Sequence, residues 1–300
     1  MRKKSKGTYV QPILDGETHS VVLAGEKKVL LEPHSEFLGV TFDQVDLSGL
    51  SLTSCKFSDC LFVNCKIEFT EFSHSQFTNT KFSKSNLLGS VFLWANMVDV
   101  TVHDCNVDNA RYNFGNLENC LFSDSNLSDT KFWETKVTDS VFKNCVLDKC
   151  QMTRTQLVNV KIQHCFTTKN SWKLLEAFLS NTTVEDCQFN HAKILYCWFT
   201  GVVLDRSNFY KSHVIGCVFQ SSKIMHVGFN EAHLGGNTFI KTCVHGGRFR
   251  LAKLRGTFFE ECKISSSSLE LTDLSKTIFF ETDLERNYTG MGDRLKTKFN

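Results

Sequence analysis

Large apolar residues recur at every fifth position over most of this 300-residue chain. The clearest run has phenylalanine at every tenth residue and an aliphatic residue midway between successive phenylalanines. The run comprises Phe189, Phe199, Phe209, Phe219, Phe229, Phe239, Phe249 and Phe259, with Ile194, Leu204, Val214, Ile224, Leu234, Val244 and Leu254 between them. A period of five matches neither the 3.6-residue turn of a helix nor the two-residue alternation of a strand. One continuous core is therefore possible only if the chain turns a corner in every repeat, which predicts a coiled ribbon.

The same register extends along both halves of the chain, from Phe37 to Ile162 and from Val184 to Leu284. A small residue stands two positions before most apolar centres, as Cys55 and Ser75 do. The other three positions of each repeat are mostly polar, and we expect them to face solvent. Self-similarity at a fixed period is the sequence signature of a solenoid.

The alternation of aromatic and aliphatic centres indicates how many repeats form one coil. A four-sided coil would stack residues twenty positions apart, so that Phe189 and Phe209 share one column and Phe199 and Phe219 the opposite column. A two-sided coil would fit the ten-residue period equally well, but it leaves little room for side chains inside.

Individual repeats resemble the pentapeptide-repeat family, in which a small and a polar residue precede Leu or Phe and two polar residues follow. The pattern appears as SNLLG at 85–89, SNLSD at 125–129 and SNFYK at 207–211. The resemblance covers about 37–162 and 182–284 and implies an all-β fold, a right-handed quadrilateral parallel β-helix with four repeats per coil. The frequent Phe centres and Cys small positions look most like the quinolone-resistance and microcin-immunity branch. The repeat regions of secreted enterobacterial effectors are also similar.

The register divides the chain into five segments. We expect an N-terminal cap at 1–36 with a β-hairpin formed by 19–23 and 28–31, an N-terminal solenoid at 37–162, an insert with a short helix at 163–183, a C-terminal solenoid at 184–284, and a tail at 285–300. The insert is predicted because 22 residues separate Ile162 from Val184, so that the register slips by two.

Within the insert, apolar residues fall on one face of a helix beginning near Ser171. The candidate partner-binding residues are Trp172, Lys173, Leu175 and Phe178. The helix could pack on the flank of the solenoid, project toward a partner, or form a hinge between two stacks. An exposed Trp is often an interface anchor, so Trp172 is the first residue to test.

Thirteen cysteines raise the question of disulfides or metal binding. Twelve follow the phase of the small position, and Cys243 alone is out of phase. This pattern predicts reduced thiols that fill the core, with no disulfides and no metal site. Buried unpaired thiols, together with the lack of a secretory or membrane-spanning apolar segment, favour a bacterial cytosol. Delivery of the protein into a host cell is the alternative.

Motifs of known chemistry are not found in the sequence: there is no P-loop, dinucleotide fingerprint, nucleophile elbow or H-E-x-x-H motif. The ten histidines are scattered, and a tube filled by its own side chains leaves no deep pocket for a substrate. The sequence therefore predicts a protein that is not an enzyme and binds no cofactor.

Two charged surfaces remain as candidate sites. The acidic set stands two residues after the apolar centres and comprises Asp99, Asp104, Asp124, Asp129, Glu134 and Asp139. The family implies a turn at this position, where Asp is expected anyway, but spaced acids could instead imitate the phosphates of duplex DNA. The basic set comprises Arg248, Arg250, Lys253 and Arg255, which adjacent sides of one coil would gather into a patch.

The leading functional hypothesis is a non-enzymatic, protein-binding solenoid that acts as an interaction scaffold or bacterial effector, with a partner of unknown identity. One alternative is a DNA mimic that protects a type II topoisomerase from quinolones or toxins. Another is binding of nucleic acid or phosphate through the basic patch.

Overall fold

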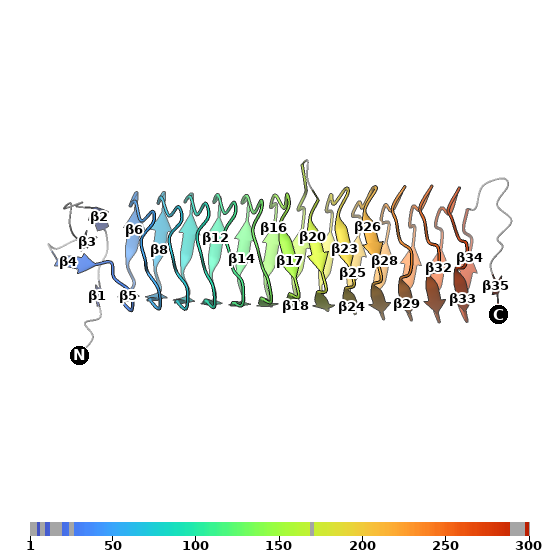
Figure 1. The fold of residues 1–300 in the computed structure, drawn as a ribbon, viewed down its shortest axis with the longest axis horizontal. Helices are drawn as coiled ribbons and strands as arrows, with labels where there is room; N and C mark the ends of the chain where they lie inside the picture. The colour runs from blue at the N-terminus through green and yellow to red at the C-terminus, as the bar shows by residue number, and fades with distance from the viewer. Residues whose placement is uncertain are drawn as a thin grey trace. The chain divides into compact units, whose positions relative to one another are not determined.

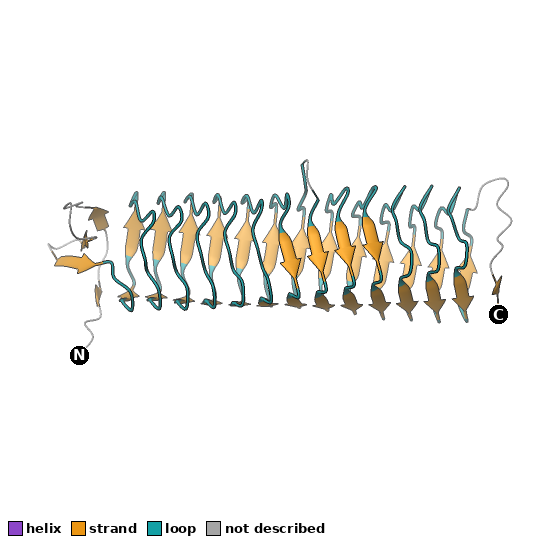
Figure 2. Cartoon of the chain, viewed as in Figure 1, coloured by secondary structure: helices purple, strands orange, loops and turns teal. Residues whose placement is uncertain are grey.

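The structure is a computed structural model that describes the backbone of residues 5–6, 10–12, 20–23, 27–168, 171–288 and 298–299 (Figure 1). Side chains are described for 31–168 and 171–288. The chain divides into two compact units, Met1–Cys150 (unit 1) and Gln151–Asn300 (unit 2). The described residues of both units form only strands and loops (Figure 2).

Unit 1 is a parallel β-solenoid with four sides per coil. Its first side consists of β5 (Glu36–Leu38), β7 (Lys56–Ser58), β9 (Gln76–Thr78), β11 (Asn96–Val98), β13 (Asn116–Glu118) and β15 (Lys136–Thr138). Its second side consists of β6 (Thr41–Asp43), β8 (Leu61–Val63), β10 (Lys81–Ser83), β12 (Thr101–His103), β14 (Leu121–Ser123) and β16 (Val141–Lys143). The third and fourth sides pair through single bridges, for example Ser51 with Glu71 and Lys66 with Asn86. Paired residues are twenty apart on every side, which confirms four repeats per coil.

Strands of the N-terminal segment pair with one another and with the first coil of unit 1. β3 (Ser20–Leu23) runs antiparallel to β4 (Lys27–Leu30), as in a hairpin, and β2 (Val10–Pro12) runs antiparallel to β3. β1 (Ser5–Lys6) and β2 also pair in parallel with β5 and β6, respectively. Pairing of this kind covers the open edge of the first coil, which would otherwise present unpaired backbone groups.

Unit 2 has the same four sides. The first side contains β18 (Gln156–Val158), β21 (Phe178–Ser180), β24 (Trp198–Thr200), β27 (Val218–Gln220), β29 (Thr238–Ile240), β31 (Phe258–Glu260), β33 (Ile278–Phe280) and β35 (Lys298–Phe299). The second contains β19 (Lys161–Gln163), β22 (Thr183–Glu185), β25 (Val203–Asp205), β28 (Lys223–Met225), β30 (Cys243–His245), β32 (Lys263–Ser265) and β34 (Asp283–Glu285). The third contains β17 (Gln151–Thr153), β20 (Lys173–Leu175), β23 (Lys193–Leu195) and β26 (His213–Ile215) and continues through bridges, and the fourth pairs through bridges alone.

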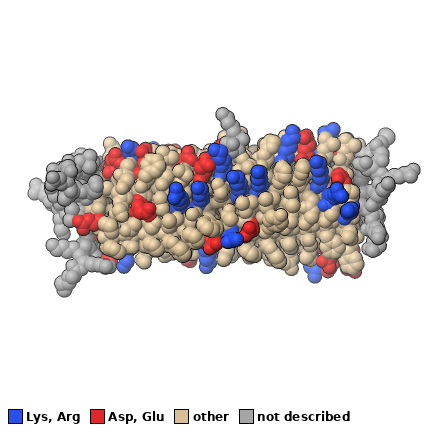
Figure 3. All heavy atoms as spheres, in the orientation of Figure 1, with Lys and Arg blue, Asp and Glu red and all other residues tan. Residues whose placement is uncertain are grey.

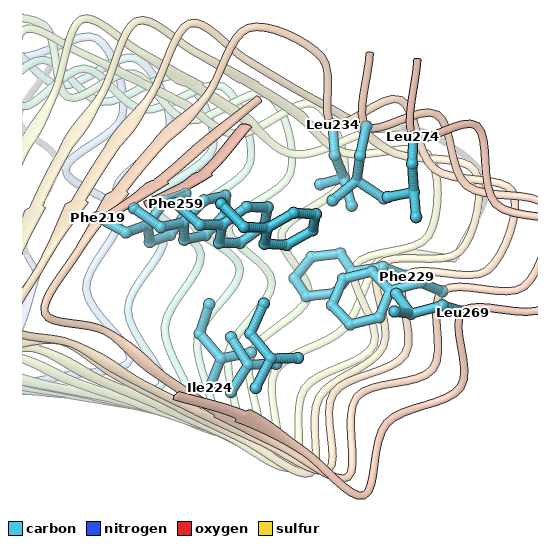
Figure 4. Close-up of a pocket in the computed structure, with 13 residues that line it drawn as sticks. Phe219, Ile224, Phe229, Leu234, Phe259, Leu269 and Leu274 are labelled. Atoms are coloured by element: carbon cyan, nitrogen blue, oxygen red, sulfur yellow. The ribbon is translucent and has the colours of Figure 1, made fainter. Parts of the chain in front are cut away.

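The predicted apolar centres line the inside of each unit in columns. In unit 2 the rings of Phe199 and Phe219 stack with centroids 4.4 Å apart, and those of Phe209 and Phe229 stack at 5.4 Å. Phenylalanine columns lie on the first and fourth sides and aliphatic columns on the second and third (Figure 4). In unit 1 the rings of Phe57 and Phe77 stack in the same way at 4.9 Å. The five-residue register therefore predicted correctly which side chains are buried, except for Leu274 and Leu284, which are half-buried.

The small position of each repeat also joins successive coils through hydrogen bonds. The Ser75 hydroxyl donates to the carbonyl of Leu52 at 2.9 Å and accepts from the amide of Cys55 at the same distance. Twelve of the thirteen cysteines are buried, and all thirteen are free thiols. Burial raises the pKa of the Cys60 thiol to about 11. Ser, Thr and Cys are thus small enough for the narrow interior and still satisfy backbone groups that would otherwise be buried without partners.

A left-handed backbone conformation forms the corner after nearly every centre. Asp99 and Asp104 have φ of 56° and 53°, and the same position is occupied by Gly39 and Gly89 in other coils. Gly, Asn and Asp tolerate this region best. Turn formation therefore explains the acids at this position, as the resemblance implied.

The predicted helical insert is wrong. The segment 171–180 forms β20 and β21, and its residues pair with residues 22 positions earlier, as Leu174 does with Met152. The two extra residues are absorbed between Thr167 and Lys173, and the next coil returns to a spacing of twenty. Because the apolar centres at Leu174 and Leu179 continue the solenoid core, strand pairing overrides the helical pattern.

Tyr112 provides a test of the core of unit 1, because it carries a hydroxyl into an otherwise apolar column. Its ring is 1% exposed and stacks between Phe92 at 4.8 Å and Phe132 at 5.1 Å. The hydroxyl has no hydrogen-bond partner among the described residues. Because a buried unsatisfied hydroxyl costs about 1–3 kcal/mol, we expect Tyr112→Phe to stabilise unit 1 by about 1 kcal/mol in urea unfolding. Phe92→Tyr, which adds a hydroxyl to the same column, should destabilise it, and a shift of both variants in one direction would contradict the prediction.

Candidate functional site

A row of mostly apolar side chains, interrupted by Thr238, lies on the outer surface of the first side of unit 2. Six consecutive strands place one residue each in this row, which we call the apolar row: Phe178, Trp198, Val218, Thr238, Phe258 and Ile278. Phe178 and Trp198 are 53% and 52% exposed, and their rings lie 6.4 Å apart. Ile278 and the neighbouring Phe280 are also exposed. The outward position of a solenoid strand needs no apolar residue for folding, so this row calls for another explanation.

The corresponding row of unit 1 is entirely polar. It contains Glu36, Lys56, Gln76, Asn96, Asn116 and Lys136. Both rows occupy the same position of the repeat and the same kind of strand. The apolar character of the row in unit 2 is therefore not a requirement of the fold.

The third side of unit 2 carries two parallel outward rows of different chemistry. The basic row comprises Lys173, Lys193, His213, His233 and Lys253, which pair rung to rung and are followed by Asp273. The aliphatic row, on the other edge of the same strands, comprises Leu175, Leu195 and Ile215. Figure 3 shows Lys and Arg side chains over the side that β20, β23 and β26 form. Desolvation, together with the charges of Lys253 and His213, lowers the pKa of His233.

Several cations on other sides of unit 2 are paired with carboxylates. Arg206 contacts Glu185 and Asp186, Lys241 is 3.5 Å from Glu261, and Lys263 is 3.4 Å from Glu285. In the described part of the chain, no ion pair joins Lys173, Lys193 or Lys253 to a carboxylate. Lys173 and Lys193 therefore present positive charge without a paired carboxylate, whereas Lys253 lies in register with Asp273, whose pKa its charge lowers.

The four predicted partner-binding residues separate onto the interior and three outward rows of unit 2. Trp172 is 1% exposed, so its assignment as an exposed anchor is wrong. Phe178 lies in the apolar row, Lys173 in the basic row and Leu175 in the aliphatic row. A strand alternates its side chains between core and solvent, and this alternation separates residues that a helix would have placed on one face.

The predicted basic patch spans two sides of one coil. Arg248 and Arg250 flank Phe249 on the fourth side, where Arg250 is 3.6 Å from Glu270. Lys253 and Arg255 flank Leu254 on the third side, and Lys253 extends the basic row. Hydrogen bonds from Ser275 and the charges of Arg255 and Lys253 lower the pKa of Asp273. The four cations thus belong to two surfaces.

The predicted acidic set does not form one surface. Asp99 and Asp139 follow the first side of unit 1, Asp104 and Asp124 the second, Asp129 the fourth and Glu134 the third. Several carboxylates already have partners: Asp124 lies 3.3 Å from His103, and Asp129 lies 3.5 Å from Lys149. Acids distributed over four corners do not follow the path of a phosphate backbone.

Unit 1 carries its own exposed aromatic residues at a corner. Trp94 is 54% exposed and stacks on Phe114 at 4.4 Å, and Trp133 lies 5.3 Å from the Phe114 ring. Trp94 and Phe114 have φ of 59° and 60°, a region that bulky residues rarely adopt. Their mutual stacking compensates part of this backbone strain.

The interior of unit 2 has no room for a substrate. One void is apolar, holds about 20 Å³ and is lined by 13 core residues such as Phe229 and Phe239, and a second void holds about 10 Å³ (Figure 4). Substrate pockets are more than ten times larger.

Over the described ranges, no group of three His, Cys, Asp or Glu residues is arranged to hold a metal ion. Across those same residues, no helix has the length and apolarity to span a membrane.

Sequence reasoning identified Phe178 but missed Trp198, Phe258 and Ile278. The signal was present, because these residues follow Phe178 by multiples of twenty, whereas the corresponding residues of the first side of unit 1 are polar. It could be recognised only once the outward positions were assigned to particular sides.

Comparisons with known proteins agree with this architecture. A family model described as "Pentapeptide repeat region" matches residues 35–112 and 192–269, more than half of the chain, and one described as "Pentapeptide repeats (8 copies)" matches 125–163. None of the curated proteins searched matches the chain.

Similar solved structures include HetL, a pentapeptide repeat protein involved in heterocyst differentiation regulation in the cyanobacterium Nostoc sp. strain PCC 7120. It is 13% identical, covers 82% of this chain and 92% of its own, and has a TM-score of 0.35. QnrB1, a plasmid-mediated fluoroquinolone resistance protein, is 13% identical over 85% of this chain and 91% of its own, with a TM-score of 0.33. The A-module of the mannuronan C-5 epimerase AlgE4 from Azotobacter vinelandii is 9% identical over 92% and 86% of the two chains, with a TM-score of 0.40.

Proposed function

Since the chain belongs to the pentapeptide-repeat family, we propose that it is a non-enzymatic scaffold that holds a protein partner on the outside of unit 2. The observation that carries the proposal is the apolar row, in which Phe178 and Trp198 are more than half exposed. Contiguous exposed apolar surface on a soluble domain usually marks an interaction site. Trp and other aromatic side chains supply much of the binding energy at protein interfaces.

The contrast with unit 1 supports a binding role for this row. Folding requires only the inward positions of each strand, and unit 1 meets that requirement with a polar outer row. The small apolar voids of unit 2 support a role without catalysis, because they cannot admit a substrate.

A substitution in the apolar row tests this proposal. We expect Trp198→Ser with Phe258→Ser to weaken binding of the partner by at least about 30-fold, the effect of losing a hot spot of 2 kcal/mol. The partner is captured from an extract of the source cells, purified, and measured against both proteins by titration calorimetry. The matched control is Asn96→Ser with Asn116→Ser, which alters the corresponding polar row of unit 1.

The proposal fails if the partner binds the variant and the wild type equally. It also fails if the wild type captures no protein beyond those captured by the variant. A dimer that dissociates on Trp198→Ser in analytical ultracentrifugation would instead assign the row to a second copy of this chain.

Twelve buried free thiols support the further proposal that the protein functions in a reducing compartment, as the phase of the cysteines had indicated.

A further inference from the structure

The basic row of unit 2 is a repulsive arrangement that the fold does not need. Lys173 pairs in register with Lys193, so that two ammonium groups lie on neighbouring strands, and the rings of His213 and His233 follow on the next two rungs with centroids 4.7 Å apart. Like charges directly opposite each other on neighbouring strands destabilise a sheet. At a corner of the fourth side, by contrast, Lys211 faces an acid, with Glu231 at 3.4 Å. An anionic ligand would neutralise the row.

The aliphatic row beside it indicates the kind of anion. Leu175, Leu195 and Ile215 lie two residues after Lys173, Lys193 and His213 on the same three strands. Two residues of a strand span about 7 Å, so a ligand on this side would contact both rows at once. A phosphate backbone has nothing apolar to place on the aliphatic row, and single-stranded nucleic acid stacks its bases on aromatic side chains, which the aliphatic row does not contain. The pair of rows suits a protein segment that is acidic along one edge and apolar along the other.

The spacing of the rows favours a helical segment over an extended one. Neighbouring rungs are about 4.8 Å apart, which is close to the 5.4 Å pitch of an α-helix. In a helix with one acid per turn, the acids stay close to the basic residues of the row. Over the four steps from Lys173 to Lys253, the offset between them grows to only about 2 Å. An extended strand repeats the same face about every 6.7 Å and would drift by about 8 Å. The length of the row, about 19 Å, corresponds to about 13 helical residues.

We propose that the third side of unit 2 binds an acidic amphipathic helix of a partner protein, with the basic row contacting its carboxylates and the aliphatic row its apolar side chains. This inference rests on the proposed function, since it names the chemistry of the partner. It uses a different surface, however, so that the two can be tested separately.

The probe is a displayed library of 14-residue helical peptides selected on the full-length protein. We expect enrichment of peptides with Asp or Glu at intervals of three or four residues beside a stripe of Leu, Ile or Val.

Lys173→Glu with Lys193→Glu and Lys253→Glu should weaken binding of the enriched peptides by about 100-fold, because three exposed ion pairs become repulsive. Lys→Gln at the same positions, which removes charge without adding repulsion, should give an intermediate loss, and Leu195→Ser should weaken binding by several-fold.

The control variant is Lys223→Glu with Lys241→Glu and Lys263→Glu, which changes the net charge of unit 2 equally but lies outside the third side. Equal weakening by the two triple variants would overturn the inference, because net charge alone would explain binding. Enrichment of peptides without acids would also overturn it, as would the absence of enrichment. So would preferential binding of a DNA duplex that is lost in the Lys173, Lys193 and Lys253 variant, which would make this side a nucleic-acid interface.

The natural partner distinguishes failure of this inference from failure of the proposed function. A partner that loses affinity with Trp198→Ser but not with the triple substitution in the basic row would leave the scaffold function standing and remove the inference. A partner unaffected by Trp198→Ser and Phe258→Ser would remove the proposed function, whatever the basic row does.

Discussion

Replacing Trp172 by alanine is expected to destabilise unit 2 by about 3–5 kcal/mol, the usual cost of truncating a buried Trp or Phe. Trp172 is 1% exposed, and its indole lies 4.5 Å from the ring of Phe189. It occupies the register position that Ala192 occupies in the next coil, whereas Thr167 occupies the position equivalent to Phe189. The indole thus fills the aromatic column in the one coil where the chain supplies only a short, partly buried side chain.

Urea unfolding followed by far-UV circular dichroism measures this effect. Trp198→Ala is the matched control, because the same residue type is removed from the exposed row and stability should change by less than about 0.5 kcal/mol. Trp172→Phe should recover part of the loss, since it restores an aromatic ring to the column. Equal stability of the Trp172→Ala and Trp198→Ala proteins would contradict the buried position of Trp172.

Trp172 also shows where sequence reasoning reached its limit. Residues 172, 175, 178 and 179 satisfy the spacing of a helical face, but Leu174 and Leu179 also satisfy the spacing of five. The two patterns overlap over a single coil, and local periodicity cannot decide between them. Pairing with the preceding and following coils decides for the strand, because it buries Leu174 and satisfies its backbone groups.

The core was predictable because it is the repeated part of the sequence. Each inward position is under the same steric constraint in every coil. Phe57, Phe77 and dozens of other centres therefore all place a large apolar side chain in the core. The outer surface carries no such redundancy. The apolar row and the basic row each occupy a single outward position on one side, where neighbours in the sequence are unrelated and neighbours in space are twenty residues apart.

The charged candidates illustrate the same point. Asp99, Asp104 and Asp129 were grouped as one acidic surface because each follows its apolar centre by two residues. Each of them does form a corner of a coil. The sides of the coil then separate them, because successive repeats turn the chain by one side. Lys253 was grouped with Arg248 by proximity in sequence, whereas the structure places it in register with His233.

The register makes a second strong prediction at Phe229. Phe229→Ala is expected to destabilise unit 2 by about 3–5 kcal/mol, because Phe229 is 3% exposed and stacks between Phe209 and Phe249 at 5.4 Å on each side. Each coil of a solenoid contacts only its neighbours, so the loss should fall on the coils around residue 229 and raise amide exchange there before it does so near β18.

Phe178→Ala is the control for this second prediction, since it removes the same atoms from the solvent-facing side of a strand and should change the midpoint of urea unfolding little. Phe229→Leu should cost less than Phe229→Ala, because Leu269 shows that an aliphatic side chain is accommodated in the same column. If Phe178→Ala destabilised the protein as much as Phe229→Ala, the distinction between inward and outward positions would be wrong, and with it the surface on which the proposed partner binds.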